Sequence, residues 1–328
     1  MKMLIIKLGA KGDVIRTLPV LIALKEKYPN SEICWITKQS SRQILETSPY
    51  IKKIITLPCE INETFDILYN FDIEEEATKL ANQIIAVKKY GFYYKDGYAN
   101  AFNLPAEYYL NTLFDDELKK TNRKTYQQMM FEVAELTYNK HHHPIYLTEK
   151  DKDYAKEFIK KNNINTEKLI GIHIGSSPRW PSKSWSEEKI KEFIKQAKQK
   201  NYEILLFGGP NEIEKHKKIS EDLKKQGIKV IQNNPYNSDN EFFALVNLCS
   251  KMICSDSFAL HVSLALKKPT IALFFCTSPN EVEDYGLLTK IISPLLYNFF
   301  PEKSDQYSEE LVNSISVEEV LKTLLSLE

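Results

Sequence analysis

Short apolar runs alternate with longer amphipathic segments along the first part of the chain. The runs MLIIKL, EICWITK, KKIITL and FDILYNF are rich in aliphatic and β-branched residues, which is typical of buried strands. Between the first two runs, PVLIALKEKY carries apolar residues at helical spacing. This alternation predicts β-α-β units that form a mostly parallel sheet.

The pattern changes near the middle of the chain and then resumes. Residues 91–143 mix aromatic and polar side chains, which predicts loops and short helices that shape a binding surface. Residues 148–167 are highly charged and mark the best domain boundary. A second series of strands and helices follows, from KLIGIHIG to PTIALFF. We therefore predict two doubly wound α/β domains, residues 1–150 and 151–328, with a final helix at VEEVLKTLLSL that could pack back on the first domain.

Composition narrows the class of protein. The 328 residues include 44 basic and 44 acidic side chains, so no net charge favours binding to nucleic acid or to an anionic membrane. The five cysteines are scattered without CxxC spacing, which predicts reduced core thiols in a cytosolic protein. No signal-peptide core and no uncharged stretch of about 18 residues is found. The segment IISPLLYNFF could touch a membrane surface, although a buried strand and loop explain it equally well.

The first candidate for chemistry is KLGAKGDVIRTLP, where a strand gives way to a helix. Gly9 and Gly12 allow close approach of a ligand to the backbone at the carboxyl end of the strand. Asp13 follows at the start of the helix. It could cap the helix, worth about 1 kcal/mol, or face a cleft and take a proton from a hydroxyl nucleophile. The residues alone leave both interpretations open.

Three loops that follow strands in the second half carry polar side chains. Hydroxyl and cationic groups in the first could contact phosphate oxygens, an acid in the second could accept from ribose hydroxyls, and the third could bind a diphosphate at a helix start. The residues are Ser176, Ser177, Arg179 and Lys183 in the first loop, Glu212 in the second, and Asp256, Ser257 and His261 in the third. Each loop also has a purely structural explanation. The first could be an ordinary solvated loop, Glu212 could be a favourable charge at a helix start, and His261 could be a core histidine.

Two further motifs are weaker candidates for metal sites. Asp151 and Asp153 form a DxD in a charged helix start rather than after a strand. His141, His142 and His143 are consecutive, so they cannot converge as a zinc site requires, and a solvated loop is the preferred interpretation. We therefore predict no metal and no other cofactor.

The motifs together resemble glycosyltransferase family 9, the bacterial heptosyltransferases of lipopolysaccharide assembly. KLGAKGDVIRTLP is similar to the opening signature of the family, GSSPRWPSKSW to its lysine-containing donor loop, FGGPNE to its ribose-side turn, and SDSFALHVSLAL to its D-[ST]-G-x-x-H helix start. The resemblance implies a GT-B fold, in which two Rossmann-like domains face each other across a cleft. Phe258 replaces the usual glycine of the last motif, Lys11 replaces a common apolar residue, and FFCTSP stands where FGPT is common.

The resemblance also implies roles for single residues and partners. Asp13 matches the general base, and Gly12, Lys11 and Arg16 are the candidates for binding a lipid-linked or oligosaccharide acceptor in the N-terminal domain. The C-terminal domain would bind a nucleotide-sugar, typically ADP-heptose, through the matching residues Ser176, Ser177, Lys183, Glu212, Asp256, Ser257 and His261. The expected reaction inverts the anomeric configuration and needs no metal. The expected location of the protein is the cytoplasm, where it could also bind peripherally to the cytoplasmic face of the inner membrane.

Two other functions remain open at this point. A nucleotide-sugar-binding protein without activity is favoured if Phe258 blocks the donor. A dinucleotide-dependent oxidoreductase would share the two-domain outline, but the chain lacks GxGxxG, and Thr37 and Lys38 occur where an acidic residue would end the second strand.

Overall fold

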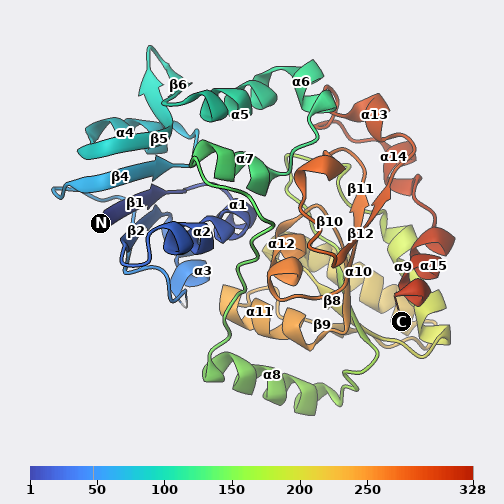
Figure 1. Ribbon diagram of the computed structural model, residues 1–328. Helices are drawn as coiled ribbons and strands as arrows, with labels where there is room; N and C mark the ends of the chain where they lie inside the picture. The colour runs from blue at the N-terminus through green and yellow to red at the C-terminus, as the bar shows by residue number, and fades with distance from the viewer. Residues whose placement is uncertain (47, 328) are drawn as a thin grey trace. The chain divides into compact units, whose positions relative to one another are not determined.

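The computed structural model describes residues 1–46 and 48–327, which form two compact units. The first unit comprises residues 1–146 and 280–283, and the second comprises residues 147–279 and 284 onward. Glu328, the last residue of the predicted second domain, lies outside the described residues. Figure 1 colours residues 1–146 of the first unit from blue to green and most of the second unit from yellow-green to red.

The first unit is built on a six-stranded sheet with strand order β3-β2-β1-β4-β5-β6. The first five strands in this order are parallel, and β6 pairs with β5 antiparallel. Because β2 and β4 lie on opposite sides of β1, the strand order reverses between β1 and β4. The elements are β1 (Lys2–Ile6), α1 (Lys11–Thr17), α2 (Pro19–Lys27), β2 (Glu32–Thr37), α3 (Arg42–Glu46), β3 (Lys53–Thr56), β4 (Phe65–Asn70), α4 (Glu75–Gln83), β5 (Ala86–Lys95), β6 (Tyr98–Ala101), α5 (Leu104–Phe114), α6 (Asp116–Thr121) and α7 (Tyr126–Val133).

The second unit contains a fully parallel sheet with strand order β12-β11-β10-β7-β8-β9. Here the order reverses between β7 and β10. The elements are α8 (Glu149–Asn162), β7 (Leu169–His173), α9 (Glu187–Gln199), β8 (Glu203–Phe207), α10 (Ile213–Lys224), β9 (Ile231–Gln232), α11 (Asp239–Leu248), β10 (Lys251–Ser255), α12 (Phe258–Ala265), β11 (Thr270–Phe274), β12 (Leu288–Ile292), α13 (Leu296–Phe299), α14 (Glu309–Asn313) and α15 (Val317–Ser326). Ligands of doubly wound sheets bind beyond the strands at such reversal points, so each unit has one expected binding edge.

The apolar runs explain the two cores. Residues 3–6 of β1 and residues 33–37 of β2 are buried, as expected for parallel strands covered on both faces. Trp185 is buried in the core of the second unit, where its indole N–H donates to the carbonyl oxygen of Ile315 (3.1 Å). All five cysteines are free thiols, and four of them are buried, as the sequence predicts.

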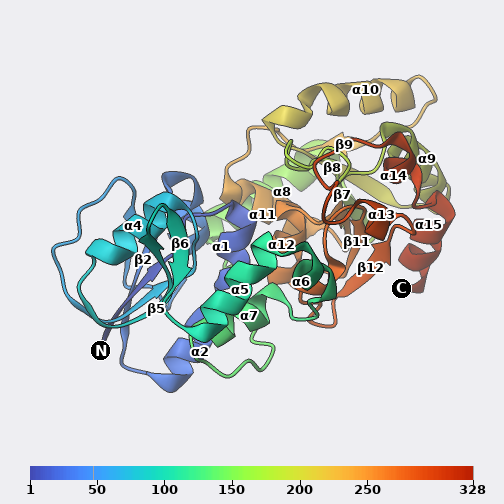
Figure 2. The ribbon, with the colours of Figure 1, turned by 90° about the horizontal axis from the view of Figure 1, so that it is seen from above.

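One expectation about elements is corrected by the structure. Residues 91–143 do contain short helices, but they begin in a β-hairpin of β5 and β6 rather than in a loop. Helix α15 lies beside α9 in both views of the chain (Figures 1 and 2), and Val317, Val320 and Leu324 belong to the core of the second unit. Within residues 1–46 and 48–327, no helix has the length and apolar character needed to cross a membrane.

Candidate functional site

The loop after β1 brings Asp13 to the reversal point of the first sheet. Ala10 is the N-cap of α1, and Asp13 lies in the first turn, so Asp13 is not the N-cap residue. A side chain at Gly9 would place its Cβ 3.2 Å from Asp13 Oδ2 and 3.3 Å from Asp72 Oδ2. A side chain at Gly9 would therefore press on two carboxylates that pack against its backbone.

Asp72 holds this loop from the neighbouring strand end. Its Oδ2 accepts hydrogen bonds from the backbone N–H of Leu8 (2.9 Å) and Gly9 (2.7 Å), and Lys7 Nζ lies 3.4 Å from the same oxygen. Burial raises the pKa of Asp72, but Lys7 and the backbone donors outweigh it and hold the pKa below its usual range. The sequence analysis did not predict the pair of Lys7 and Asp72. The signal that could have revealed it is an ionisable residue just after each of two strands, in KLG and in NFD.

The predicted acceptor residues occupy three different environments. Arg16 Nη2 lies 2.8 Å from Asp13 Oδ1, and its guanidinium carbon lies 3.8 Å from the centre of the Tyr126 ring. Gly12 is buried in the first turn of α1, and Lys11 is half-buried at the first position of the same helix. The structure thus brings Arg16 to Asp13 directly.

At the reversal point of the second sheet, Lys183, Asp256, Ser257 and His261 come together. Lys183 Nζ lies 3.2 Å from Asp256 Oδ2, and His261 Nε2 lies 3.9 Å from Asp256 Oδ1. Ser257 is the N-cap of α12, but its hydroxyl makes no capping bond and lies 3.4 Å from His173 Nδ1. The start of α12 therefore presents backbone N–H groups beside a lysine and two histidines, an arrangement that suits an anionic ligand.

His173 is a further candidate for this site, and the sequence analysis did not predict it. It is the last residue of β7, directly beside the end of β10. Burial, together with the charges of His216 and Lys215, lowers the pKa of His173 to about 4. The imidazole is therefore neutral at pH 7. A histidine at a strand end that faces a helix start is the signal that could have identified it.

Glu212 and the first loop lie at the ends of β7 and β8. Glu212 Oε2 accepts from the backbone N–H of Gly209 (2.8 Å), and a Cβ at Gly175 would lie 2.7 Å from Glu212 Cδ. Lys215 Nζ donates to the carbonyl oxygen of Ile174 (3.0 Å). In the loop itself Ser176 is half-buried, and Ser177 and Arg179 are exposed. Glu212 thus joins two predicted donor loops, which is compatible with the ribose contact expected of it.

Phe258, the first residue of α12, packs in an aromatic cluster with two phenylalanines of α11. Its ring is half-buried and lies 5.5 Å from the ring of Phe242 and 6.1 Å from that of Phe243, measured between centres. Phe242 in turn contacts His173 edge to face at 6.2 Å. The helix start accommodates phenylalanine in place of the glycine of the family motif because the ring packs against α11.

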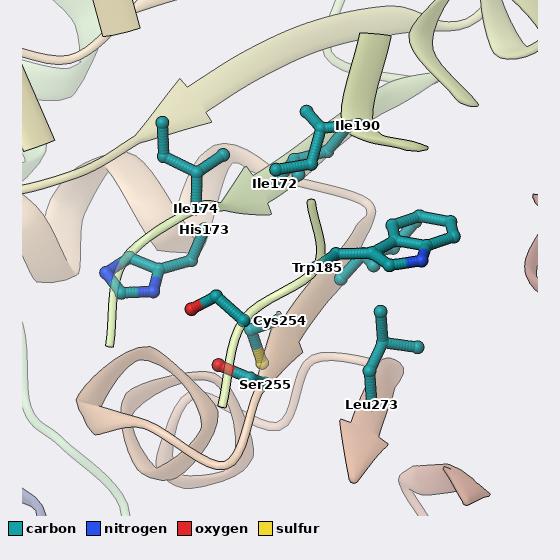
Figure 3. Close-up of a pocket in the computed structure, with 10 residues that line it drawn as sticks. Ile172, His173, Ile174, Trp185, Ile190, Cys254, Ser255 and Leu273 are labelled. Carbon is teal, nitrogen blue, oxygen red and sulfur yellow. The ribbon is translucent and has the colours of Figure 1, made fainter. Parts of the chain in front are cut away.

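A small cavity lies under this site, between the ends of β7 and β10. Figure 3 shows the imidazole of His173 and the indole of Trp185 on opposite sides of it, with Cys254 and Ser255 between them. Its volume is about 20 Å³, which accommodates about one water molecule and no nucleotide. The hydroxyls of Ser184 and Ser255 are buried without a hydrogen-bond partner in the described part of the chain.

The two weaker metal motifs have structural roles. Asp151 forms a capping box with Thr148 at the start of α8, and Asp153 pairs with Lys156. The interpretation of the histidines as a solvated loop is wrong for two of them, because His141 stacks on Phe131 and His143 is buried. Among residues 1–46 and 48–327, no three His, Cys, Asp or Glu side chains group as metal ligands.

Comparison with known proteins identifies the family. Residues 62–312 match glycosyltransferase family 9 (heptosyltransferase). The chain is 23% identical over 317 residues to lipopolysaccharide heptosyltransferase 1 of Campylobacter coli, and this covers 87% of the chain and 90% of the relative.

Two solved structures share the fold. A glycosyl transferase family 9 protein from Veillonella parvula has a TM-score of 0.81 at 22% identity, covering 99% of this chain and 96% of the other. The E. coli ADP-heptose lps heptosyltransferase II has a TM-score of 0.73 at 18% identity, covering 100% of this chain and 98% of the other. The predicted α/β fold with two Rossmann-like units is thus confirmed, and the chain belongs to glycosyltransferase family 9, the enzyme class predicted from its sequence.

Proposed function

We propose that the protein transfers a heptose from ADP-heptose to a sugar hydroxyl of a lipopolysaccharide-core acceptor. Family membership supports glycosyl transfer, and the names of the relatives supply the sugar, the nucleotide and the lipopolysaccharide. The first unit, with Asp13, receives the acceptor, and the second unit, with Lys183 and the start of α12, binds the donor. The donor and the acceptor are the expected partners, and nucleic acid is not.

Asp13 acts as the general base in this proposal. Its carboxylate takes the proton from the acceptor hydroxyl, and the oxygen attacks the anomeric carbon of the donor from the face opposite the diphosphate. The bond from the anomeric carbon to the diphosphate oxygen breaks, and its electron pair leaves with ADP. The configuration at the anomeric carbon therefore inverts. Asp13 is suited to this role because a cation fixes one carboxylate oxygen and because 32% of its side chain is exposed.

The second unit stabilises the negative charge that grows on the leaving group. The backbone N–H groups at the start of α12 and the ammonium of Lys183 meet the diphosphate, with His261 and the neutral His173 beside it. Glu212 accepts from the ribose hydroxyls once it exchanges its contact with Gly209, and Ser176 and Ser177 donate to phosphate oxygens. These groups carry the charge without a metal ion.

The place of action follows from the substrates. We propose that the enzyme works in the cytoplasm and contacts the inner membrane peripherally, because a lipid-linked acceptor is held there. The segment 291–300 supplies one exposed contact, since Ile292 and Tyr297 are 44% and 56% exposed.

The observation that carries the proposal is the place of Asp13 in the first turn of α1, at the reversal point of the first sheet. Asp13→Asn preserves the shape and removes the base, so kcat should fall by roughly two to four orders of magnitude. Asp116→Asn, the same change in the first turn of α6, is the matched control and should leave turnover unchanged. Near-normal turnover in Asp13→Asn would contradict the assignment. Binding of ADP-heptose without any turnover by the unmodified chain would favour the non-catalytic alternative.

A further inference from the structure

Two separate contacts lead from Tyr126 to Asp13. Tyr126 is the first residue of α7, and it is fully buried. Its hydroxyl lies 2.9 Å from Thr17 Oγ1, and Thr17 Oγ1 donates to the backbone carbonyl of Asp13 (2.7 Å). Because the only hydroxyl proton of Thr17 is used in that bond, the Tyr126 hydroxyl donates to Thr17. This contact fixes the backbone of Asp13.

The second contact fixes the side chain. The Tyr126 ring lies under the Arg16 guanidinium at 3.8 Å, and Arg16 Nη2 binds Asp13 Oδ1 at 2.8 Å. A planar guanidinium that stacks on an aromatic face has few alternative orientations. The position of the Tyr126 ring therefore sets the direction in which the N–H groups of Arg16 point. Both contacts therefore start at Tyr126 and end at Asp13, one at its backbone carbonyl and the other at its carboxylate.

We propose that Tyr126 and Arg16 are positioning residues that aim the Asp13 carboxylate, and that Arg16 does not bind the acceptor. The inference depends on the proposed function, because it requires Asp13 to be the base. It revises the expected acceptor role of Arg16. A carboxylate held in one direction meets the acceptor hydroxyl at the distance that proton transfer needs, and a displacement of about 1 Å can reduce turnover about 100-fold.

The charges around Asp13 keep Arg16 in this role. Burial lowers the pKa of Arg16, but Asp13 and its tyrosine neighbours outweigh this effect, so the guanidinium remains charged at every pH of interest. The other titratable groups that face Asp13 or Arg16 come from the segments that follow β1 and β4, from α5 and α7, and from the segment 280–283. They are Lys7, Asp72, Tyr109, Tyr126 and Glu281.

The first test separates positioning from acceptor binding by kinetics. Wild type, Arg16→Gln, Arg16→Lys and Tyr126→Phe are compared with ADP-heptose and O-deacylated, heptose-free lipopolysaccharide core. We expect kcat to fall about 10- to 100-fold in Arg16→Gln, less in Arg16→Lys, and about 3- to 10-fold in Tyr126→Phe, with the acceptor KM within about twofold of wild type. Tyr69→Phe removes another buried hydroxyl of the same unit and should leave kcat unchanged.

The second test asks whether these residues act through Asp13. In an Asp13→Asn background, Arg16→Gln and Tyr126→Phe should reduce the residual rate by less than about twofold, because the group that they aim is absent. A full loss in that background, or a rise in the acceptor KM with kcat unchanged, would overturn the inference. Normal turnover in Asp13→Asn alone would instead overturn the proposed base. Melting temperatures of the singly substituted proteins identify any loss caused by unfolding, and Tyr126→Phe and Arg16→Lys provide variants that keep the ring and the charge.

Discussion

Lys183 and Asp256 form an ion pair at the start of α12, with Lys183 Nζ 3.2 Å from Asp256 Oδ2. Both side chains are mostly shielded, with 13% and 17% of their area exposed. The pair holds the ammonium at the helix start before any ligand binds. An incoming diphosphate can then share this cation with Asp256, so little side-chain ordering remains to be done on binding.

Removal of this cation should weaken nucleotide binding. We expect Lys183→Met to raise the Kd of ADP roughly 10- to 100-fold, because a charge-assisted hydrogen bond contributes about 1.5–3 kcal/mol. Lys224→Met, at an exposed lysine in the last turn of α10, is the control and should leave the Kd unchanged. Titration calorimetry checks both variants. Equal ADP affinity in wild type and Lys183→Met would remove Lys183 from the donor site.

Loss of the buried carboxylate of Asp72, which holds the loop between β1 and α1, should destabilise the first unit. Asp72→Asn leaves the buried ammonium of Lys7 without its carboxylate partner, and we expect a loss of about 3–5 kcal/mol in the free energy of unfolding at pH 7. Glu74→Gln breaks an exposed pair with Lys38 and should cost about 1 kcal/mol or less. Denaturant unfolding of both variants gives the comparison.

The same substitution should change the pH dependence of stability. The pKa of Asp72 is lowered in the folded protein, so its contribution is complete above the unfolded pKa of about 3.9 and is lost as the pH falls through the lower folded value. Wild type should therefore lose stability as the pH falls below about 4, and Asp72→Asn should show a smaller loss in that window. If the free energies of unfolding of the two proteins changed in parallel with pH, the pKa of Asp72 would not be lowered in the folded protein.

The Phe258 ring should contribute to stability more than to nucleotide preference. Because the ring is half-buried against Phe242 and Phe243, Phe258→Ala should cost about 1–3 kcal/mol, below the range for a fully buried ring. The Kd of ADP should change by less than about threefold, since the backbone N–H groups of α12 remain in place. Tyr236→Ala, at a tyrosine that is 71% exposed, is the control for melting. An unchanged melting temperature with a large shift in affinity would place the ring in the donor pocket.

The sequence was sufficient to predict most of the fold because buried parallel strands are short apolar runs. It did not predict β5, β6 or β12. Residues of the β5–β6 hairpin are mixed aromatic and polar, and LTKII of β12 lies at a sheet edge where half-exposed positions remove the apolar signal. Register and pairing of such edges depend on the neighbouring strand rather than on the local pattern.

Some residues of the candidate site could likewise be predicted from the sequence, and others could not. Asp13, Lys183 and Asp256 could be selected because they follow strand ends or lie in motifs that resemble the family. Tyr126 could not, because its partner Thr17 is 109 residues away and only the folded chain brings the two together. Arg16 was selected for its charge, and the structure shows that the charge is directed at Asp13.

The central claim is that the protein transfers heptose from ADP-heptose to a lipopolysaccharide core with Asp13 as base and without a metal. The most direct measurement incubates the purified protein with ADP-heptose and O-deacylated, heptose-free lipopolysaccharide core in EDTA, and follows the acceptor by mass spectrometry. The account predicts one added heptose with inverted anomeric configuration in wild type, and a product formed roughly 100- to 10,000-fold more slowly in Asp13→Asn. Absence of the product in EDTA with recovery in Mg²⁺ or Mn²⁺, or transfer only from a different nucleotide-sugar, would contradict it.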